Sequence, residues 1–193
     1  MVQLTGKSNI KTAVFISGTG TNLKSLIKFS KTKKSPITID VIVSNNYKAK
    51  GLQYAKIFRI KKKIYNFKNQ SIAEKRIISD LKKEKIRLIC LAGFMVILSK
   101  NFIKKFNGKI LNIHPSLLPK FKGLNTHQRA LQENEKYSGC TVHFVSSKLD
   151  SGKIILQKKV KIKKRETLRS LTKKVLNQEH KLYPKAILKI INS

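Results

Sequence analysis

The sequence predicts an α/β fold, in which a single Rossmann-like domain has a mostly parallel, twisted sheet flanked by helices and an antiparallel extension in its C-terminal half. Apolar, β-branched runs alternate with amphipathic segments through residues 12–113, which is typical of parallel strands joined by helices. The run 87–94 is almost wholly apolar, as in a central strand covered on both faces. Two extended segments on either side of the turn 146–153 predict an antiparallel pair.

The first half of the chain contains the expected alternation of strands and helices. Gly, Pro, Asn or Ser residues punctuate the apolar runs, and the amphipathic segments space their apolar residues three or four apart. We expect, in chain order, strand 12–18, helix 23–31, strand 37–45, helix 52–60, a connecting segment 61–67 with at most a brief strand, helix 72–85, strand 87–94, a loop and short helix over 95–106, and strand 109–113.

The second half of the chain has a different pattern. Residues 127–137 predict a helix, which is followed by extended segments at 139–145 and 154–162. The last region, 167–192, predicts a long helix that contains Pro184. Because proline lacks the backbone N–H group, we expect Pro184 to kink this helix or to start a new one.

The length and the apolar pattern bound the class of protein. A chain of 193 residues without internal repeats or linkers fits one domain, and we expect that domain to span 1–193, with halves at about 12–110 and 111–190. No apolar run approaches the ~20 residues of a membrane-spanning helix. The first apolar run is too short for a signal peptide, so we expect a cytoplasmic protein with no membrane partner.

The charge of the chain is strongly positive. Lys and Arg number 43 against 9 Asp and Glu, a formal net charge of +34. Such a charge often indicates a nucleic-acid partner, but here the basic residues are spread over loops, helices and strands, for example at 31–35 and 158–164. We therefore expect no specific nucleic acid, only non-specific attraction to polyanions at low salt. Cys90 and Cys140 lie in separate apolar segments and are expected to be buried free thiols.

The segment LNIHPSLLP, 111–119, places two polar side chains at the end of a predicted strand. Asn112 and His114 are two residues apart, so in an extended backbone they face the same side. Pro115 and Pro119 then restrict the backbone that follows. An amide donor and a titratable ring held in this way could act on one substrate atom. A histidine before proline, seen alone, is more often a turn residue, and that alternative stays open at this point.

The segment GTGTN, 18–22, follows the first predicted strand and precedes the first predicted helix. A strand, a Gly-rich turn and a helix in this order can present backbone N–H groups to an anion. The alternative is a tight turn that uses Gly only for its conformational freedom. Because ligands of parallel sheets bind at the carboxyl ends of the strands, GTGTN, GFMVIL and NIHPSLLP are all expected at one edge of the sheet.

The chain has only 9 Asp and Glu residues, so the position of each one is informative. Asp150 lies in the Gly-containing turn LDSG, and Glu179 lies beside His180 in NQEH. An ordinary turn Asp and an exposed helical Glu are the alternative readings of these two positions.

The motifs ISGTGTN, LAGFM, LNIHPSLLP, GLNTHQRAL, TVHFV with LDSG, and QEH occur in this order and together resemble the folate-dependent phosphoribosylglycinamide formyltransferase family. The resemblance covers about residues 12–185. It implies transfer of a formyl group from 10-formyltetrahydrofolate to the glycinamide amine of N1-(5-phosphoribosyl)glycinamide in de novo purine biosynthesis. It also implies small-molecule substrates and no metal, and we expect a monomer or a homodimer.

The resemblance further implies roles for individual residues. The catalytic residues would be Asn112, His114 and Asp150. The residues that bind the ribonucleotide and its phosphate would be Gly20, Thr21, Asn22, Gln70 and Glu179. The residues that border the folate would be Met95, Val96, Ile97, Leu98, Asn112, Ser146, Ser147, Lys148 and Leu149. The chain departs from the family where Val96 and Gln70 stand at positions usually occupied by Arg.

The predicted residue types suit this chemistry. Asn112 can donate a hydrogen bond to the formyl oxygen, His114 can move a proton, and Asp150 can orient the imidazole. His127 and His143 lack ligand spacing and are expected to be structural. The alternative functions are a methionyl-tRNA formyltransferase-like enzyme, a formyltetrahydrofolate hydrolase, and a basic nucleic-acid-binding protein on an inactive enzyme scaffold.

Overall fold

The computed structural model describes residues 9–192 of the chain. These residues form two compact units, the first ending at Leu111 and the second beginning at Asn112. The boundary falls within strand β5 (Lys109–His114), so this strand begins in one unit and ends in the other. The expectation of one domain over 1–193 stays a prediction.

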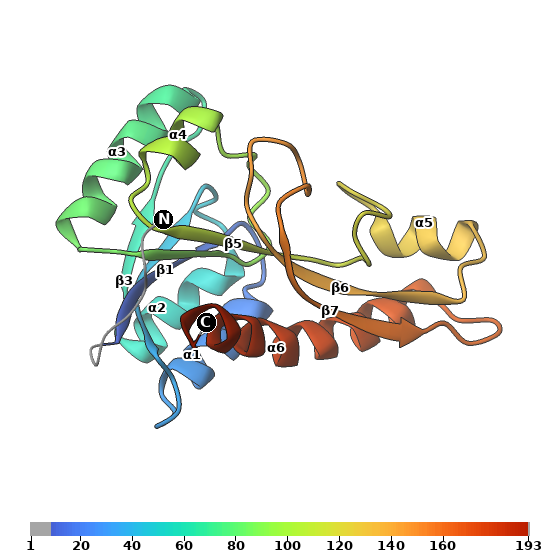
Figure 1. Cartoon of the computed structure of the whole chain (residues 1–193). Helices are drawn as coiled ribbons and strands as arrows, with labels where there is room; N and C mark the ends of the chain where they lie inside the picture. The colour runs from blue at the N-terminus through green and yellow to red at the C-terminus, as the bar shows by residue number, and fades with distance from the viewer. Residues whose placement is uncertain (1–8, 193) are drawn as a thin grey trace. The chain divides into compact units, whose positions relative to one another are not determined.

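The first unit is built on a parallel sheet (Figure 1). Its strands are β1 (Ile10–Ile16), β2 (Ile37–Ser44), β3 (Lys61–Ile64) and β4 (Leu88–Leu91), and they hydrogen-bond in the order β3-β2-β1-β4, with β5 next to β4. β1 pairs in parallel with both β2 and β4, and β2 pairs in parallel with β3. All four residues of β4 are buried, as the apolar run in the sequence predicts for a central strand.

The helices of the first unit pack by their apolar faces. They are α1 (Thr21–Ser30), the 3₁₀ helix η1 (Lys50–Leu52), α2 (Gln53–Phe58), α3 (Gln70–Lys83) and α4 (Lys100–Lys105). In α3 the buried residues Ala73, Ile77 and Leu81 are four apart and so lie on one face. α3 and α4 lie side by side in Figure 1.

The second unit is an antiparallel hairpin with a long helix (Figure 1). Strands β6 (Tyr137–Phe144) and β7 (Ile154–Lys161) pair from Tyr137 opposite Lys161 to His143 opposite Ile154. Helix α5 (Thr126–Gln132) precedes the hairpin, and α6 (Leu168–Asn192) packs along both strands. The α/β class, with a mostly parallel sheet, flanking helices and an antiparallel C-terminal extension, is therefore confirmed.

Several predicted boundaries are wrong for local physical reasons. The helix predicted over 127–137 ends at Gln132, because Asn134 adopts a positive φ of 50° and Tyr137 already pairs within β6. The strand predicted over 87–94 ends at Leu91, just before Gly93 turns the backbone with a φ of 74°. No new helix starts at Pro184, because α6 continues through it and buries side chains on both sides of the proline.

The structure also describes the two cysteines and the length and polarity of the helices. Cys90 and Cys140 are buried thiols outside any disulfide, as expected. Within residues 9–192, the helices are all too short or too polar to cross a membrane.

Candidate active site

The candidate site in the second unit starts from the loop that follows β5. His114 is the last residue of β5 and is buried, and the segment after it is held by side chains from the hairpin. The hydroxyl of Thr141 donates to the carbonyl of Ser116 at 2.7 Å and accepts the N–H of Leu118 at 3.1 Å. The Gln157 amide donates to the carbonyl of Leu118 at 2.8 Å. These hydrogen bonds fix the irregular backbone beside His114, as the predicted stiff turn requires.

The structure brings the three predicted catalytic residues together. Asp150 Oδ2 lies 3.4 Å from His114 Nδ1, and Asp150 Oδ1 lies 3.5 Å from the side-chain nitrogen of Asn112. The backbone N–H of Gly123 donates to Asp150 Oδ2 at 2.9 Å. Asp150 is thus more than an ordinary turn residue, because its carboxylate faces both polar residues of the β5 motif. The catalytic roles themselves stay predictions.

His143 joins this cluster, which the sequence did not predict. Its Nε2 lies 3.2 Å from Asn112 Nδ2 and 3.6 Å from Asp150 Oδ1, and its Nδ1 lies 2.8 Å from the carbonyl of Phe144. Because a carbonyl only accepts, Nδ1 carries a hydrogen, and Nε2 faces both the Asn112 amide and the Asp150 carboxylate. A usable signal was present, since Thr141 and His143 put two polar residues on one face of β6, whereas Cys140, Val142 and Phe144 alternate with them on the other face.

The turn that carries Asp150 depends on an unusual backbone. Asp150 has a φ of 45°, a left-handed conformation that Asp tolerates better than most residues. A Cβ added to Gly152 would lie 1.7 Å from the carbonyl oxygen of Phe144. Gly152 is therefore required for the close approach that places the carboxylate.

Burial and hydrogen bonding set the protonation states of the cluster. Burial lowers the pKa of His114 from its usual 6.5, so the ring is neutral at pH 7. Its hydrogen lies on Nε2, which is 2.8 Å from the carbonyl of Phe121, and Nδ1 therefore presents a lone pair toward Asp150. Burial opposes ionisation of Asp150, but the contact with His143 and the hydrogen bond from the Gly123 N–H outweigh it and hold the pKa of the carboxyl below its usual value. An ionised carboxylate beside an imidazole lone pair favours proton uptake at Nδ1.

The predicted phosphate turn lies in the first unit. β1 ends at Ile16, and α1 begins at Thr21 with Gly20 as its N-cap at a φ of 71°. The first turn of α1 contains no acidic residue, and no side chain caps it. A Cβ added to Gly20 would lie 2.7 Å from the Cα of Gly51, so the two backbones meet closely. Thr21 is half-buried and Asn22 is buried in that first turn. This arrangement suits an anion at the helix N-terminus.

The predicted folate segment of the first unit, 95–98, has no helix or strand and shows apolar side chains to solvent. Met95 is 67% exposed and Ile97 is 64% exposed, whereas Val96 is half-buried and Leu98 is buried. Gln70 lies beside this segment, because its Nε2 donates to the carbonyl of Ile97 and to Glu74 Oε1, each at 2.8 Å. The predicted contact of Gln70 with substrate stays a prediction.

The remaining predicted residues lie in the second unit. Ser147, Lys148 and Leu149 are exposed in the turn after β6, and the Ser146 hydroxyl donates to the carbonyl of Lys148 at 3.0 Å. Glu179 is buried on α6, so the exposed-helix reading of this acid is wrong. Burial, together with the charge of Glu179, raises the pKa of the Cys140 thiol to about 12.

Comparison with known proteins decides the family. The model of the formyl transferase family matches residues 10–187, nearly the whole chain. The chain belongs to the formyl transferase family. Among residues 9–192, no three His, Cys, Asp or Glu side chains are placed to bind a common metal ion.

This formyl transferase is similar to proteins of different lengths. It is 42% identical over 180 residues to the phosphoribosylglycinamide formyltransferase of Haemophilus influenzae, covering 92% of this chain and 85% of that protein. It is 44% identical over 184 residues to the human trifunctional purine biosynthetic protein adenosine-3, covering 94% of this chain but only 18% of that protein. The crystal structure of phosphoribosylglycinamide formyltransferase from Brucella melitensis superimposes with a TM-score of 0.91 at 39% identity, covering 96% of this chain and 97% of that one.

Proposed function

We propose that this formyl transferase moves a formyl group from 10-formyltetrahydrofolate to the glycinamide amine of N1-(5-phosphoribosyl)glycinamide, a step of de novo purine biosynthesis. The observation that carries the proposal is the cluster of Asn112, His114 and Asp150 in a chain 42% identical to a phosphoribosylglycinamide formyltransferase over 85% of that relative's length. The cluster combines a hydrogen-bond donor, a neutral base and an ionised carboxylate, which are the groups that formyl transfer to an amine needs.

In the first step, the amine nitrogen attacks the formyl carbon and the carbonyl electrons move to the formyl oxygen. The Asn112 amide is the proposed donor to this developing negative charge. One of its two hydrogens faces His143 Nε2 at 3.2 Å, whereas the other reaches Asp150 only at 3.5 Å. The second hydrogen is weakly held and is the one available to the substrate.

In the second step, the attacking nitrogen loses its proton. The proposed acceptor is Nδ1 of His114, which carries the lone pair and becomes an imidazolium stabilised by Asp150 at 3.4 Å. The tetrahedral intermediate then collapses, the bond between the formyl carbon and the folate nitrogen breaks, and the proton passes to that nitrogen. Positioned proton transfer of this kind contributes about 10²–10⁴-fold, and orientation of the two substrates supplies the rest.

The proposed substrate contacts follow the predicted binding residues. The N-terminus of α1, at Gly20, Thr21 and Asn22, is proposed to bind the 5′-phosphate through backbone N–H groups. Glu179 is proposed to lie toward the ribonucleotide. Folate is proposed to border two segments, Met95–Leu98 and Ser146–Leu149, whose exposed members Met95, Ile97 and Leu149 suit an apolar ring.

A direct assay tests the proposal. Purified full-length protein is mixed with 10-formyltetrahydrofolate and N1-(5-phosphoribosyl)glycinamide, and release of tetrahydrofolate is followed, with His114→Ala as the inactive control. We expect turnover by the wild type that survives EDTA, because the proposed steps use only side chains. Absence of turnover, together with tight sequence-dependent RNA binding at physiological salt, would instead favour the nucleic-acid-binding alternative. We also propose that the protein is a monomer or a homodimer and that it is located in the cytoplasm.

A further inference from the structure

The segment between β4 and α4 is irregular, so its backbone groups need partners outside regular secondary structure. Three such groups, on alternate residues, find side chains. The N–H of Met95 donates to the Ser17 hydroxyl, the carbonyl of Ile97 accepts from the Gln70 amide, and the N–H of Ser99 donates to Glu74, each at 2.8 Å. The backbone is therefore held at both ends.

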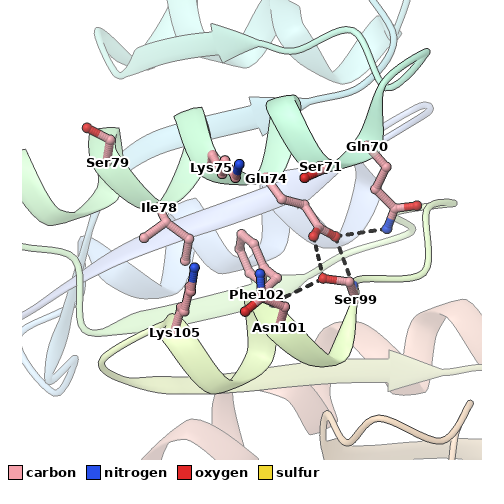
Figure 2. Close-up of a pocket in the computed structure, with 10 residues that line it drawn as sticks. All are labelled: Gln70, Ser71, Glu74, Lys75, Ile78, Ser79, Ser99, Asn101, Phe102 and Lys105. Carbon is pink, nitrogen blue, oxygen red and sulfur yellow. Dashed lines mark hydrogen bonds between the residues drawn. The ribbon is translucent and has the colours of Figure 1, made fainter.

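Glu74 is the centre of this arrangement (Figure 2). It is only 5% exposed on α3, and its carboxylate accepts from the Gln70 amide, from the Ser99 N–H and from the Ser99 hydroxyl. Ser99 is also the N-cap of α4, where its hydroxyl oxygen accepts the N–H of Phe102 at 3.0 Å. One buried carboxylate thus links α3 to the start of α4 and to the segment before it.

We propose that Gln70 and Glu74 are positioning residues for the folate substrate, holding the backbone of Ile97–Ser99 so that Met95 and Ile97 present a preformed apolar surface. This inference rests on the proposed function. The two apolar side chains are exposed to water by more than half, yet their backbone is fixed, which lowers the entropy cost of binding a flat apolar ring.

The hydrogen bonds of Gln70 also bear on its own role. Both hydrogens of its amide nitrogen have acceptors, Glu74 Oε1 and the Ile97 carbonyl. The side chain then offers a ligand only its carbonyl oxygen, which is an acceptor and cannot bind a phosphate dianion. Gln70 therefore acts on folate through the segment it holds, rather than on the phosphate.

The chain offers a matched control on the same helix. Asp80 of α3 is another partly buried carboxylate, which accepts from the Tyr65 hydroxyl at 2.6 Å and pairs with Lys63 at 3.0 Å. Lys63 lies in β3 and Tyr65 directly follows it, so both partners are at least 30 positions from residues 95–99 in the sequence. Asp80→Asn therefore removes a comparable charge without loosening the folate segment.

The test compares Gln70→Met and Glu74→Gln with Asp80→Asn in steady-state kinetics. Freeing the backbone of a single residue costs about tenfold in affinity when binding must order it again. We expect the KM for 10-formyltetrahydrofolate to rise about tenfold in both variants, with the KM for the ribonucleotide within about twofold and kcat within about threefold. Asp80→Asn should lower Tm without changing either KM. Gln70→Met keeps the side-chain volume at a half-exposed site, so it should fold.

Two further measurements keep the inference separate from the proposed function. Calorimetric titration with tetrahydrofolate measures folate binding without turnover, and hydrogen exchange of the peptide covering 92–99 measures the order of the segment. Tenfold weaker folate binding and faster exchange in both variants would support the inference even if the wild type showed no turnover. Unchanged folate binding despite a lowered Tm, unchanged exchange, an effect on ribonucleotide KM alone, or no binding of tetrahydrofolate to the wild type would overturn it.

Discussion

Replacement of Asp150 by Asn is the sharpest test of the candidate site. Asn has nearly the same shape, tolerates the φ of 45° found at this position, and can still accept the N–H of Gly123. The substitution therefore removes the negative charge and leaves the turn in place. In the proposed mechanism this charge matters only when His114 holds a proton, so we expect a large loss of kcat and little change in either KM.

The size of the effect follows from the geometry. Unit charges 3.4 Å apart, the distance between His114 Nδ1 and Asp150 Oδ2, attract by about 5 kcal/mol at an effective dielectric constant of about 20. Solvent screening is limited, because the side chains of the pair are only 6% and 7% exposed. An Asn dipole recovers part of this energy, so we expect kcat to fall by about 10³-fold.

The assay is steady-state kinetics with each substrate varied in turn, and circular dichroism verifies folding. Asp80→Asn provides the matched control, since it removes a carboxylate that lies outside the proposed site, and its kcat should stay within about twofold of the wild type. A kcat loss smaller than tenfold in Asp150→Asn, or an equal loss in kcat and in substrate binding, would refute the reasoning and make Asp150 a structural residue.

Four further predictions concern protonation, the turn and the surface charge. The acid limb of kcat/KM, measured between pH 5 and 9, should report a pKa below 6.5, because burial lowers the pKa of His114. In Asp150→Asn this limb should move to still lower pH, because the carboxylate charge that raises the pKa of His114 is removed. A shift of the limb to higher pH would contradict this assignment. The same lowered pKa should make the free energy of unfolding decrease as pH falls below about 6.5, since the unfolded chain takes up the proton first. Gly152→Ala should lower Tm in thermal scans by several degrees and also reduce kcat, because the added Cβ would lie 1.7 Å from the Phe144 carbonyl oxygen. The control is Gly18→Ala, which should leave Tm nearly unchanged, because the added Cβ would have no atom within 4 Å. RNA binding by filter retention should be independent of sequence and fall by at least tenfold between about 50 and 200 mM salt, and salt-resistant, sequence-specific binding would argue for a nucleic-acid function.

The sequence determined the elements whose signals are local. β-Branched runs and helical spacing gave the order of strands and helices, and the i, i+2 spacing of Asn112 and His114 placed both side chains on one side of β5. Local signals failed at the ends of elements. Residues 133–137 have a helical composition, but the pairing of Tyr137 with Lys161, 24 positions later, takes this residue into β6. Pro184 gave a local signal for a break, yet packing on both sides keeps α6 continuous.

The candidate site likewise combines features that the sequence predicts with features that only the tertiary structure sets. The sequence by itself provided the residue types and motifs: the Gly-rich turn at the start of α1, Asn112 and His114 at the end of β5, and Asp150 in a turn. Only the tertiary structure decided that His143 joins them and that Glu74 and Gln70 hold the segment 95–99. It also decided which form of His114 is present, because burial lowers its pKa and a carbonyl fixes its hydrogen on Nε2. Periodicity and turn chemistry act between near neighbours in the chain, whereas burial and hydrogen-bond partners depend on residues that folding brings together.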